Sequence, residues 1–408
     1  MKKYIFLLLT GLVPGAGSNV YSQWQILNFP SNMALDRGSF PTAQVGFVAN
    51  SNNNKLWRTI DGGATWDSIT FANSVRDVDF ISADTGFVVH GTPSTYKLSI
   101  TVNGGNTWSD VNIPVPAFNY CNMVYFTSYT NGVVTISEDS VLITSNTGAT
   151  WTKAGLGAYG MMAEKEHINN DTLIFTGSDG TFAYRGAIFR SDDGGNNWQT
   201  IIHDSSYTVF TGTHFLNGSL GFAVYNNGWN PGISTLIKTD DGGTTWSDFY
   251  TDTTVIFQDV FMNSVNGGYI MGTNTNGTNG IILKTNNGST WTTDFTTPYP
   301  AVRFIKGGNA LYGIGNGGLV IKNSNPNGIE EYKTEEGFLY PNPSDGLYQT
   351  GFTETTSVAI YNVSGKLLKT VVLPAGEKLD VRELKNGMYI ARFTSNNINA
   401  KSRLVIAR

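Results

Sequence analysis

The 408-residue sequence predicts an all-β protein, a seven-bladed β-propeller followed by a small C-terminal β-sandwich. Three observations lead to this prediction. Only 14% of the residues are charged, while 12% are aromatic and 47 are glycine, which is typical of strands joined by tight turns. A turn motif ending in tryptophan recurs six times, and after residue 328 this motif disappears and the composition changes.

The first 22 residues have the features of a secretory signal peptide. Lys2 and Lys3 precede an apolar run over residues 4–9, and a small-residue pattern ends at Ser22. A membrane anchor is the alternative, but the run is far shorter than the ~20 apolar residues of a transmembrane helix. We therefore expect export, cleavage near Ser22 and no transmembrane segment in the mature chain.

The clearest copy of the turn motif is Thr-Ile-Asp-Gly-Gly-Ala-Thr-Trp at residues 59–66. Its Asp, or Asn in other copies, can accept hydrogen bonds within the turn, its glycines permit positive φ, and its Trp buries a large ring. Six near-identical copies around a ring cannot all be one active site. We interpret these residues as structural: Asp61, Trp66, Asn103, Trp108, Asn146, Trp151, Asp193, Trp198, Asp241, Trp246, Asn287 and Trp291.

A second signature, of the form Phe-x5-Gly-Phe/Tyr-x-Val, lies ahead of each turn motif; residues 40–48 and 80–88 are examples. With one degenerate copy at residues 169–174 it occurs seven times, once more than the turn motif. The seventh unit lacks a turn motif, whereas residues 24–29 resemble the strand that follows one. We expect this first strand to complete the last blade and close a ring over residues 23–328.

The turn motif resembles the Asp-box (BNR) repeat of sialidases, sortilin-type receptors, tandem-propeller xyloglucanases and photosystem II assembly-factor-like propellers. The two signatures together are most similar to the photosystem II assembly-factor type. Sortilin-type receptors carry a cysteine-rich module, whereas this chain has one cysteine, Cys121, and its length suits one propeller rather than two. The resemblance is specific for fold and weakly specific for function.

The resemblance to sialidases implies an arginine triad, a Tyr–Glu nucleophile pair and an acidic proton donor. Arg37 lies near the position of their first-blade arginine and Arg76 is a second candidate, but the Phe-Arg-Ile-Pro motif is absent. Any other glycosidase would need two carboxylates about 5–10 Å apart. Asp79, Glu166 and Asp259, which shortly precede first-strand aromatic residues, are candidates; solvated residues of an axial channel are the simpler interpretation.

Propellers usually bind ligands on the face opposite these turns, where the predicted loops are rich in Asn and Gly. Trp229 lies in such a loop, remote from both signatures, and its ring suits stacking on a sugar or a peptide unless it packs on its own blade. Paired histidines, a calcium loop and a nucleotide-binding loop are all lacking, so we expect no metal and no cofactor. A net charge of −5 gives no support for nucleic-acid binding.

A linker at residues 329–334 leads to a series of short predicted strands over residues 335–408. This tail resembles the type A C-terminal sorting domain of the type IX (Por) secretion system of Bacteroidetes. The resemblance rests on Tyr340, Pro341, Asn342 and Pro343, on Asn386, Gly387 and Tyr389, and on a basic last strand with Lys401. It implies Sec export to the periplasm and delivery by the type IX machinery to the cell surface or the medium; an Ig-like adhesion module is the alternative.

The leading interpretation is thus a secreted or cell-surface propeller that binds a glycan or a protein. The alternative is an extracellular glycoside hydrolase that uses axial carboxylates.

Overall fold

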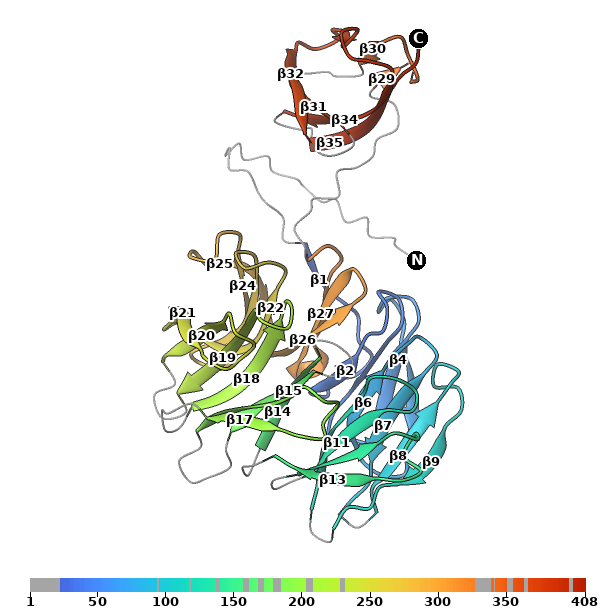
Figure 1. Cartoon of the computed structure of the whole chain (residues 1–408), viewed down its shortest axis with the longest axis vertical. Coiled ribbons are helices and arrows are strands. Elements are labelled where there is room, and N and C mark those ends of the chain that lie inside the picture. The colour runs from blue at the N-terminus through green and yellow to red at the C-terminus, as the bar shows by residue number, and fades with distance from the viewer. Residues whose placement is uncertain are drawn as a thin grey trace, which may run out of the picture. The chain divides into compact units, whose positions relative to one another are not determined.

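The computed structural model describes residues 23–93, 95–116, 119–136, 140–156, 161–167, 172–178, 185–202, 208–227, 232–326, 339–340, 342–350, 355–362, 366–395 and 399–408 (Figure 1). In these residues the one helix is a single 3-10 turn, η1 (Asn316–Gly318), and no helix is long and apolar enough to span a membrane. The chain divides into two compact units with a boundary after Asn327.

In its described part the first unit is a propeller of seven four-stranded antiparallel sheets, arranged around a centre in Figure 1. Sheets 1 to 3 consist of β2 (Arg37–Ser39), β3 (Gly46–Ala49), β4 (Lys55–Thr59) and β5 (Asp67–Thr70); β6 (Val75–Phe80), β7 (Gly86–His90), β8 (Lys97–Thr101) and β9 (Ser109–Asn112); and β10 (Cys121–Phe126), β11 (Gly132–Ile136), β12 (Ser140–Thr144) and β13 (Thr152–Gly155). Sheets 4 to 6 consist of β14 (Met161–His167), β15 (Leu173–Ser178), β16 (Gly186–Ser191) and β17 (Gln199–Ile202); β18 (Thr208–Phe215), β19 (Gly221–Asn227), β20 (Ser234–Thr239) and β21 (Ser247–Asp252); and β22 (Val255–Met262), β23 (Gly268–Asn274), β24 (Gly280–Thr285) and β25 (Thr292–Thr297).

Sheet 7 joins the two ends of the propeller chain. It contains β26 (Ala301–Gly307), β27 (Ala310–Gly315), β28 (Val320–Asn323) and, as its outer strand, β1 (Trp24–Ile26). Trp24 pairs with Asn323 and Ile26 with Ile321. The first strand therefore completes the last sheet, as the sequence predicts.

In four of the seven sheets, those with Gly46, Gly86, Gly132 and Gly221, the Phe and Gly of the second signature meet across the first hairpin. Phe80 pairs with Gly86, and a Cβ on Gly86 would overlap the Phe80 ring; Gly46 stands in the same relation to Phe40. In three pairs of neighbouring sheets, an aromatic residue of the second strand stacks on the signature Phe of the next sheet. The ring centroids lie 3.6 Å apart for Phe47 and Phe80, 3.6 Å for Phe87 and Phe126, and 3.7 Å for Tyr312 and Phe40, which closes the ring.

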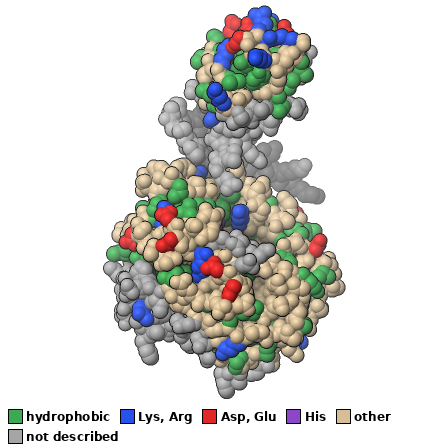
Figure 2. Space-filling model, in the orientation of Figure 1, with side chains coloured by type: hydrophobic (Ala, Val, Ile, Leu, Met, Phe, Trp, Pro, Cys, Tyr) green, Lys and Arg blue, Asp and Glu red, His purple; other side chains and the backbone are tan. Residues whose placement is uncertain are grey.

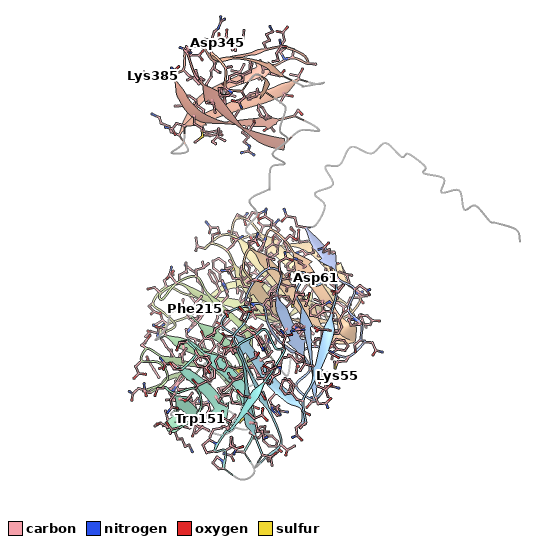
Figure 3. The ribbon with its side chains drawn as sticks, turned by 90° about the vertical axis from the view of Figure 1, so that its right-hand side faces the viewer. Lys55, Asp61, Trp151, Phe215, Asp345 and Lys385 are labelled. Atoms are coloured by element: carbon pink, nitrogen blue, oxygen red, sulfur yellow. The ribbon has the colours of Figure 1, made fainter. Side chains whose placement is uncertain are left out.

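The turn motifs are held by bonds within each turn. Thr59 Oγ1 accepts from the Gly63 amide at 2.8 Å, and Asp61 Oδ1 accepts from the Thr65 amide at 2.9 Å. Gly62 and Gly63 have φ of 73° and 92°, which favours glycine. The Trp rings pack on aromatic neighbours; that of Trp108, for example, lies 5.3 Å from Phe71. Asp61 and Trp151, labelled in Figure 3, belong to the motifs of sheets 1 and 3.

The second unit is a β-sandwich. One sheet has the order β29 (Leu339–Tyr340), β30 (Leu347–Thr350), β33 (Leu379–Asp380), and the other β32 (Leu367–Leu373), β31 (Thr356–Asn362), β34 (Gly387–Thr394), β35 (Asn399–Ile406). Side chains from both sheets, including Tyr348, Leu379, Phe393 and Leu404, form one buried core. The predicted fold class, a propeller followed by a small sandwich, describes both units.

Candidate functional site

A cavity of about 200 Å³ lies among the first strands of five sheets, β2, β14, β18, β22 and β26, which are central in Figure 1. Its ionisable lining residues are Lys165, His214, Asp259, Arg303 and Lys306. Arg303 is half-buried and Lys306 is exposed. On the face shown in Figure 2, charged side chains are few on the propeller.

A β-bulge shapes the first strand of six of the seven sheets. The pairing with the second strand shifts register at equivalent points, between Val75 and Asp77, Cys121 and Met123, Met162 and Glu164, Phe210 and Gly212, Phe257 and Asp259, and Ala301 and Arg303. Bulges redirect side chains and often lie near functional sites. Here the residues after two bulges, Asp77 and Asp259, contact the first strand of the next sheet.

These two aspartates accept equivalent hydrogen bonds from the backbone of the neighbouring sheet. Asp77 Oδ2 accepts from the Val124 amide at 2.9 Å, and Asp259 Oδ2 accepts from the Phe304 amide at 2.7 Å. A first strand is an edge strand, so its inward N–H groups need partners. The carboxylates therefore connect neighbouring sheets.

A second set of such bonds lies two residues further along the first strands. Asp79 Oδ2 accepts from the Phe126 amide at 2.7 Å, His214 Nδ1 from the Met262 amide at 3.3 Å, and Ser39 Oγ from the Phe80 amide at 3.0 Å. Three different residue types thus perform one structural task at equivalent positions.

Asp77 also lies at the centre of a buried ion cluster. Lys165 Nζ is 2.5 Å from Asp77 Oδ2, and Arg37 Nε is 3.9 Å from Asp77 Oδ1. The exposed side-chain fractions are 2% for Asp77, 13% for Lys165 and 16% for Arg37. Lys165 donates in addition to the Val124 carbonyl at 2.6 Å. The cluster therefore joins sheets 1, 2, 3 and 4.

Burial shifts two axial pKa values. It raises the pKa of Asp79 to about 6, despite the opposing effects of Lys165 and the Phe126 amide. It lowers the pKa of His214 to about 4, helped by the charge of Lys306. His214 is thus neutral at pH 7, as its acceptor role at Nδ1 requires.

The structure brings some of the candidates from the sequence together. Arg37 Nε donates to the Arg76 carbonyl at 3.1 Å, and Arg76 Nε donates to the Cys121 carbonyl at 3.3 Å. Asp79 lies in the same strand as Arg76, whereas Asp259 lines the cavity from sheet 6. Glu166 of β14 pairs with Ile174 of β15. The side chain of Glu166 lies outside the described residues, as does the whole of Trp229.

Sequence reasoning missed Asp77, Lys165, His214, Arg303 and Lys306 as axial site residues. The sequence did contain a signal for Asp77. Asp77 stands nine residues before the signature glycine Gly86, just as the candidate Asp259 stands nine residues before Gly268. No group of three or more His, Cys, Asp or Glu side chains suited to a metal ion occurs in the part of the chain that the structure describes.

The motif residues of the tail support its last strand and the preceding turn. Asn342 Oδ1 accepts from the Val405 amide at 2.9 Å, Asn386 Nδ2 donates to the Arg408 carbonyl at 3.2 Å, and Tyr389 donates to the Lys385 carbonyl at 2.8 Å. Gly387 has a φ of 154°, and the bond between Asn342 and Pro343 is cis. Pro341 lies outside the described residues, and only the backbones of Tyr340 and Lys401 are described.

Both parts of the chain are similar to known protein families. Residues 338–407 match the secretion system C-terminal sorting domain, and residues 68–221 match photosynthesis system II assembly factor YCF48. A curated relative is the photosystem II assembly lipoprotein Ycf48 of Synechococcus sp. (strain CC9902), 29% identical over 148 residues. That alignment spans 36% of this chain and 41% of the relative, which is less than half of either protein.

Two solved structures have the same propeller fold. YCF48 bound to D1 peptide has a TM-score of 0.60 and 17% identity, covering 74% of this chain and 96% of that one. YCF48 from Cyanidioschyzon merolae has a TM-score of 0.59 and 14% identity, covering 75% and 99%. The chain therefore joins a YCF48-like BNR propeller to a Por secretion system C-terminal sorting domain, which indicates export through the type IX pathway.

Proposed function

We propose that this protein is a binding protein of the cell surface or the medium, and that its axial cavity holds an acidic segment of a peptide or protein. The observation that carries the proposal is the charge of the cavity lining, in which the described residues include three cations, Lys165, Arg303 and Lys306, and one carboxylate, Asp259. Residues 1–22 act in this proposal as the signal peptide for Sec export. The solved structure of YCF48 with a D1 peptide supports a peptide as the ligand class.

We assign Lys306, whose side chain is exposed, and Arg303 to the ligand because both line the cavity. Lys165 bonds to Asp77 and to the Val124 carbonyl. Guanidinium and ammonium groups form strong charge-assisted hydrogen bonds with carboxylates. A volume of about 200 Å³ suits one acidic side chain or a chain terminus better than an extended polysaccharide.

The bonds of the axial carboxylates favour binding over glycoside hydrolysis. A glycosidase needs one carboxyl group to protonate the leaving oxygen and another to act as base or nucleophile. Asp259 accepts from the Val260 and Phe304 amides, and Asp79 accepts from the Phe126 amide. Both carboxylates thus accept backbone hydrogen bonds that hold neighbouring sheets together.

The binding proposal is tested with the full chain and a panel of acidic peptides, each compared with its neutral amide counterpart by calorimetry. We expect binding that needs the carboxylates, that weakens at high salt and that falls at least tenfold in Lys306→Glu. Lys55→Glu, a charge reversal at the exposed first residue of β4, is the matched control. Equal affinity for the neutral peptides, or hydrolysis of a polysaccharide, would contradict the proposal.

The export proposal is tested separately in cells of a species that has the type IX system. Deletion of residues 335–408 should leave the protein in the periplasm, whereas full-length Lys306→Glu should reach the surface or the medium. Normal delivery of the deletion variant would overturn the sorting assignment without affecting the binding proposal.

A further inference from the structure

Cations connect neighbouring sheets at the rim that carries the turn motifs. The cation stands just before the last residue of the third strand and donates to the carbonyl of the first glycine in the turn motif of the next sheet. The observed pairs are Arg58 Nη1 with Gly104 at 2.7 Å, Arg190 Nη1 with Gly242 at 2.5 Å, and Lys322 Nζ with Gly62 at 3.2 Å.

The junction between sheets 3 and 4 lacks this cation. Ile143 occupies the position of Arg58, and Thr152, which pairs with Ile143, occupies that of Asp67, the ion-pair partner of Arg58. The acceptor glycine is present as Gly194. A cavity of about 290 Å³ lies here, lined by Ile143, Thr152 and Gly194 among others.

The surroundings of the glycines show the same difference. A Cβ on Gly62 would lie 2.6 Å from Lys322 Nζ, and one on Gly242 would lie 2.7 Å from Arg190 Nη1. A Cβ on Gly194 would meet no atom of the described residues within 4 Å. Among the described residues, no side chain fills at Gly194 the space that Lys322 fills at Gly62 and Arg190 fills at Gly242.

The lining of this rim cavity suits a long cationic side chain. Asp193 is the one charged residue among the described residues that line it. Val133 and Leu173 provide buried apolar wall, against which an alkyl stem can pack. Asn131 and Asn196 at its edge are exposed, so the cavity can be reached from solvent.

The junction between sheets 2 and 3 offers an internal contrast. Ile100 again replaces the cation, but the next motif has Thr147, with a φ of 60°, in place of the glycine. The Thr147 hydroxyl donates to the Tyr129 carbonyl at 3.1 Å. A side chain of the protein itself thus occupies the corresponding place.

We propose that the rim cavity between sheets 3 and 4 binds an arginine side chain of a partner protein. The guanidinium donates to the Gly194 carbonyl, as Arg58 donates to Gly104 within the chain, and lies beside Asp193. Arginine offers five donors in a planar group, enough to reach the carbonyl and the polar edge of the cavity together. This site is distinct from the axial cavity and does not depend on the proposed function.

The first experiment measures binding of N-acetyl-arginine-methylamide to the full chain by NMR titration, with the neutral isostere N-acetyl-citrulline-methylamide as the control ligand. We expect the arginine compound to bind at least tenfold more tightly. Equal binding of the citrulline compound, or tighter binding of n-butylammonium or Ca²⁺, would overturn the assignment to arginine.

Three variants locate the site. Ile143→Arg supplies the cation from within and should weaken arginine binding at least tenfold, whereas Ile100→Arg at the neighbouring junction should leave it unchanged. Thr152→Asp, an exposed substitution that restores the carboxylate of sheet 1, should strengthen binding several-fold. If Ile143→Arg or Thr152→Asp left arginine binding unchanged, the site would be refuted. Lys306→Glu should bind the compound like the wild type.

Discussion

Aspartates at the propeller axis and in the turn motifs differ in what they join. At the axis, Asp77 and Asp259 are buried and accept hydrogen bonds from the backbone of the next sheet. In the turn motifs, Asp61 and Asp241 are exposed. The hydrogen bonds described for their carboxylates all come from residues of the same turn. Loss of the Asp77 or Asp259 side chain should therefore weaken the contact between neighbouring sheets, whereas loss of a turn carboxylate should affect one turn.

The largest effect is expected for Asp77→Ala. The substitution removes the carboxylate that lies 2.5 Å from Lys165 and 3.9 Å from Arg37, and it takes the acceptor from the Val124 amide. Removal of one partner from a buried ion pair costs about 3–5 kcal/mol. The free energy of unfolding can be measured by denaturation with tryptophan fluorescence, which reports on the propeller alone because all nine tryptophans precede the tail.

Asp67→Ala is the matched control, since it breaks the ion pair between Asp67 and Arg58. The Asp67 side chain is 57% exposed. Such pairs contribute about 0–1 kcal/mol. If Asp77→Ala cost no more than this control, the axial cluster would not hold the sheets together.

This contrast also explains what the sequence could predict. The turn motif and the Phe–Gly signature encode local geometry, because Gly86 must accept the Phe80 ring and Gly63 must adopt positive φ. The axial bonds join residues more than 40 positions apart, and a bulge decides which side chain faces the neighbouring strand. Lys165, which reaches sheets 2 and 3 from sheet 4, follows no local pattern.

Asp79→Asn should show a pH-dependent effect of intermediate size. Because the folded-state pKa of Asp79 is raised from 3.8 to about 6, the folded protein binds this proton more tightly, and wild-type stability falls as the pH rises from 4 to 6. Asparagine resembles the protonated form and its Oδ1 can still accept from the Phe126 amide. The variant should gain up to about 3 kcal/mol at pH 7.5 and nothing at pH 4.

Denaturation at these two pH values tests the sign directly. Asp84→Asn, an exposed change in the turn that follows β6, provides the control. A variant that is less stable than the wild type at pH 7.5 would mean that the charged carboxylate is needed to bind Lys165 or the neighbouring sheet.

The smallest effect is expected for Asp61→Asn, with the opposite dependence on pH. Hydrogen bonds from Thr65 and Thr59 lower the pKa of Asp61 to about 2, so its contribution is present above the unfolded value of 3.8 and is lost as the pH falls through about 2. Asn103 and Asn146 accept the same amide bonds in sheets 2 and 3, which shows that an amide fits the turn. The variant should therefore lose little stability at pH 7, and the difference should vanish near pH 2. A loss as large as that of Asp77→Ala would mean that the turn carboxylates, like the axial ones, hold neighbouring sheets together.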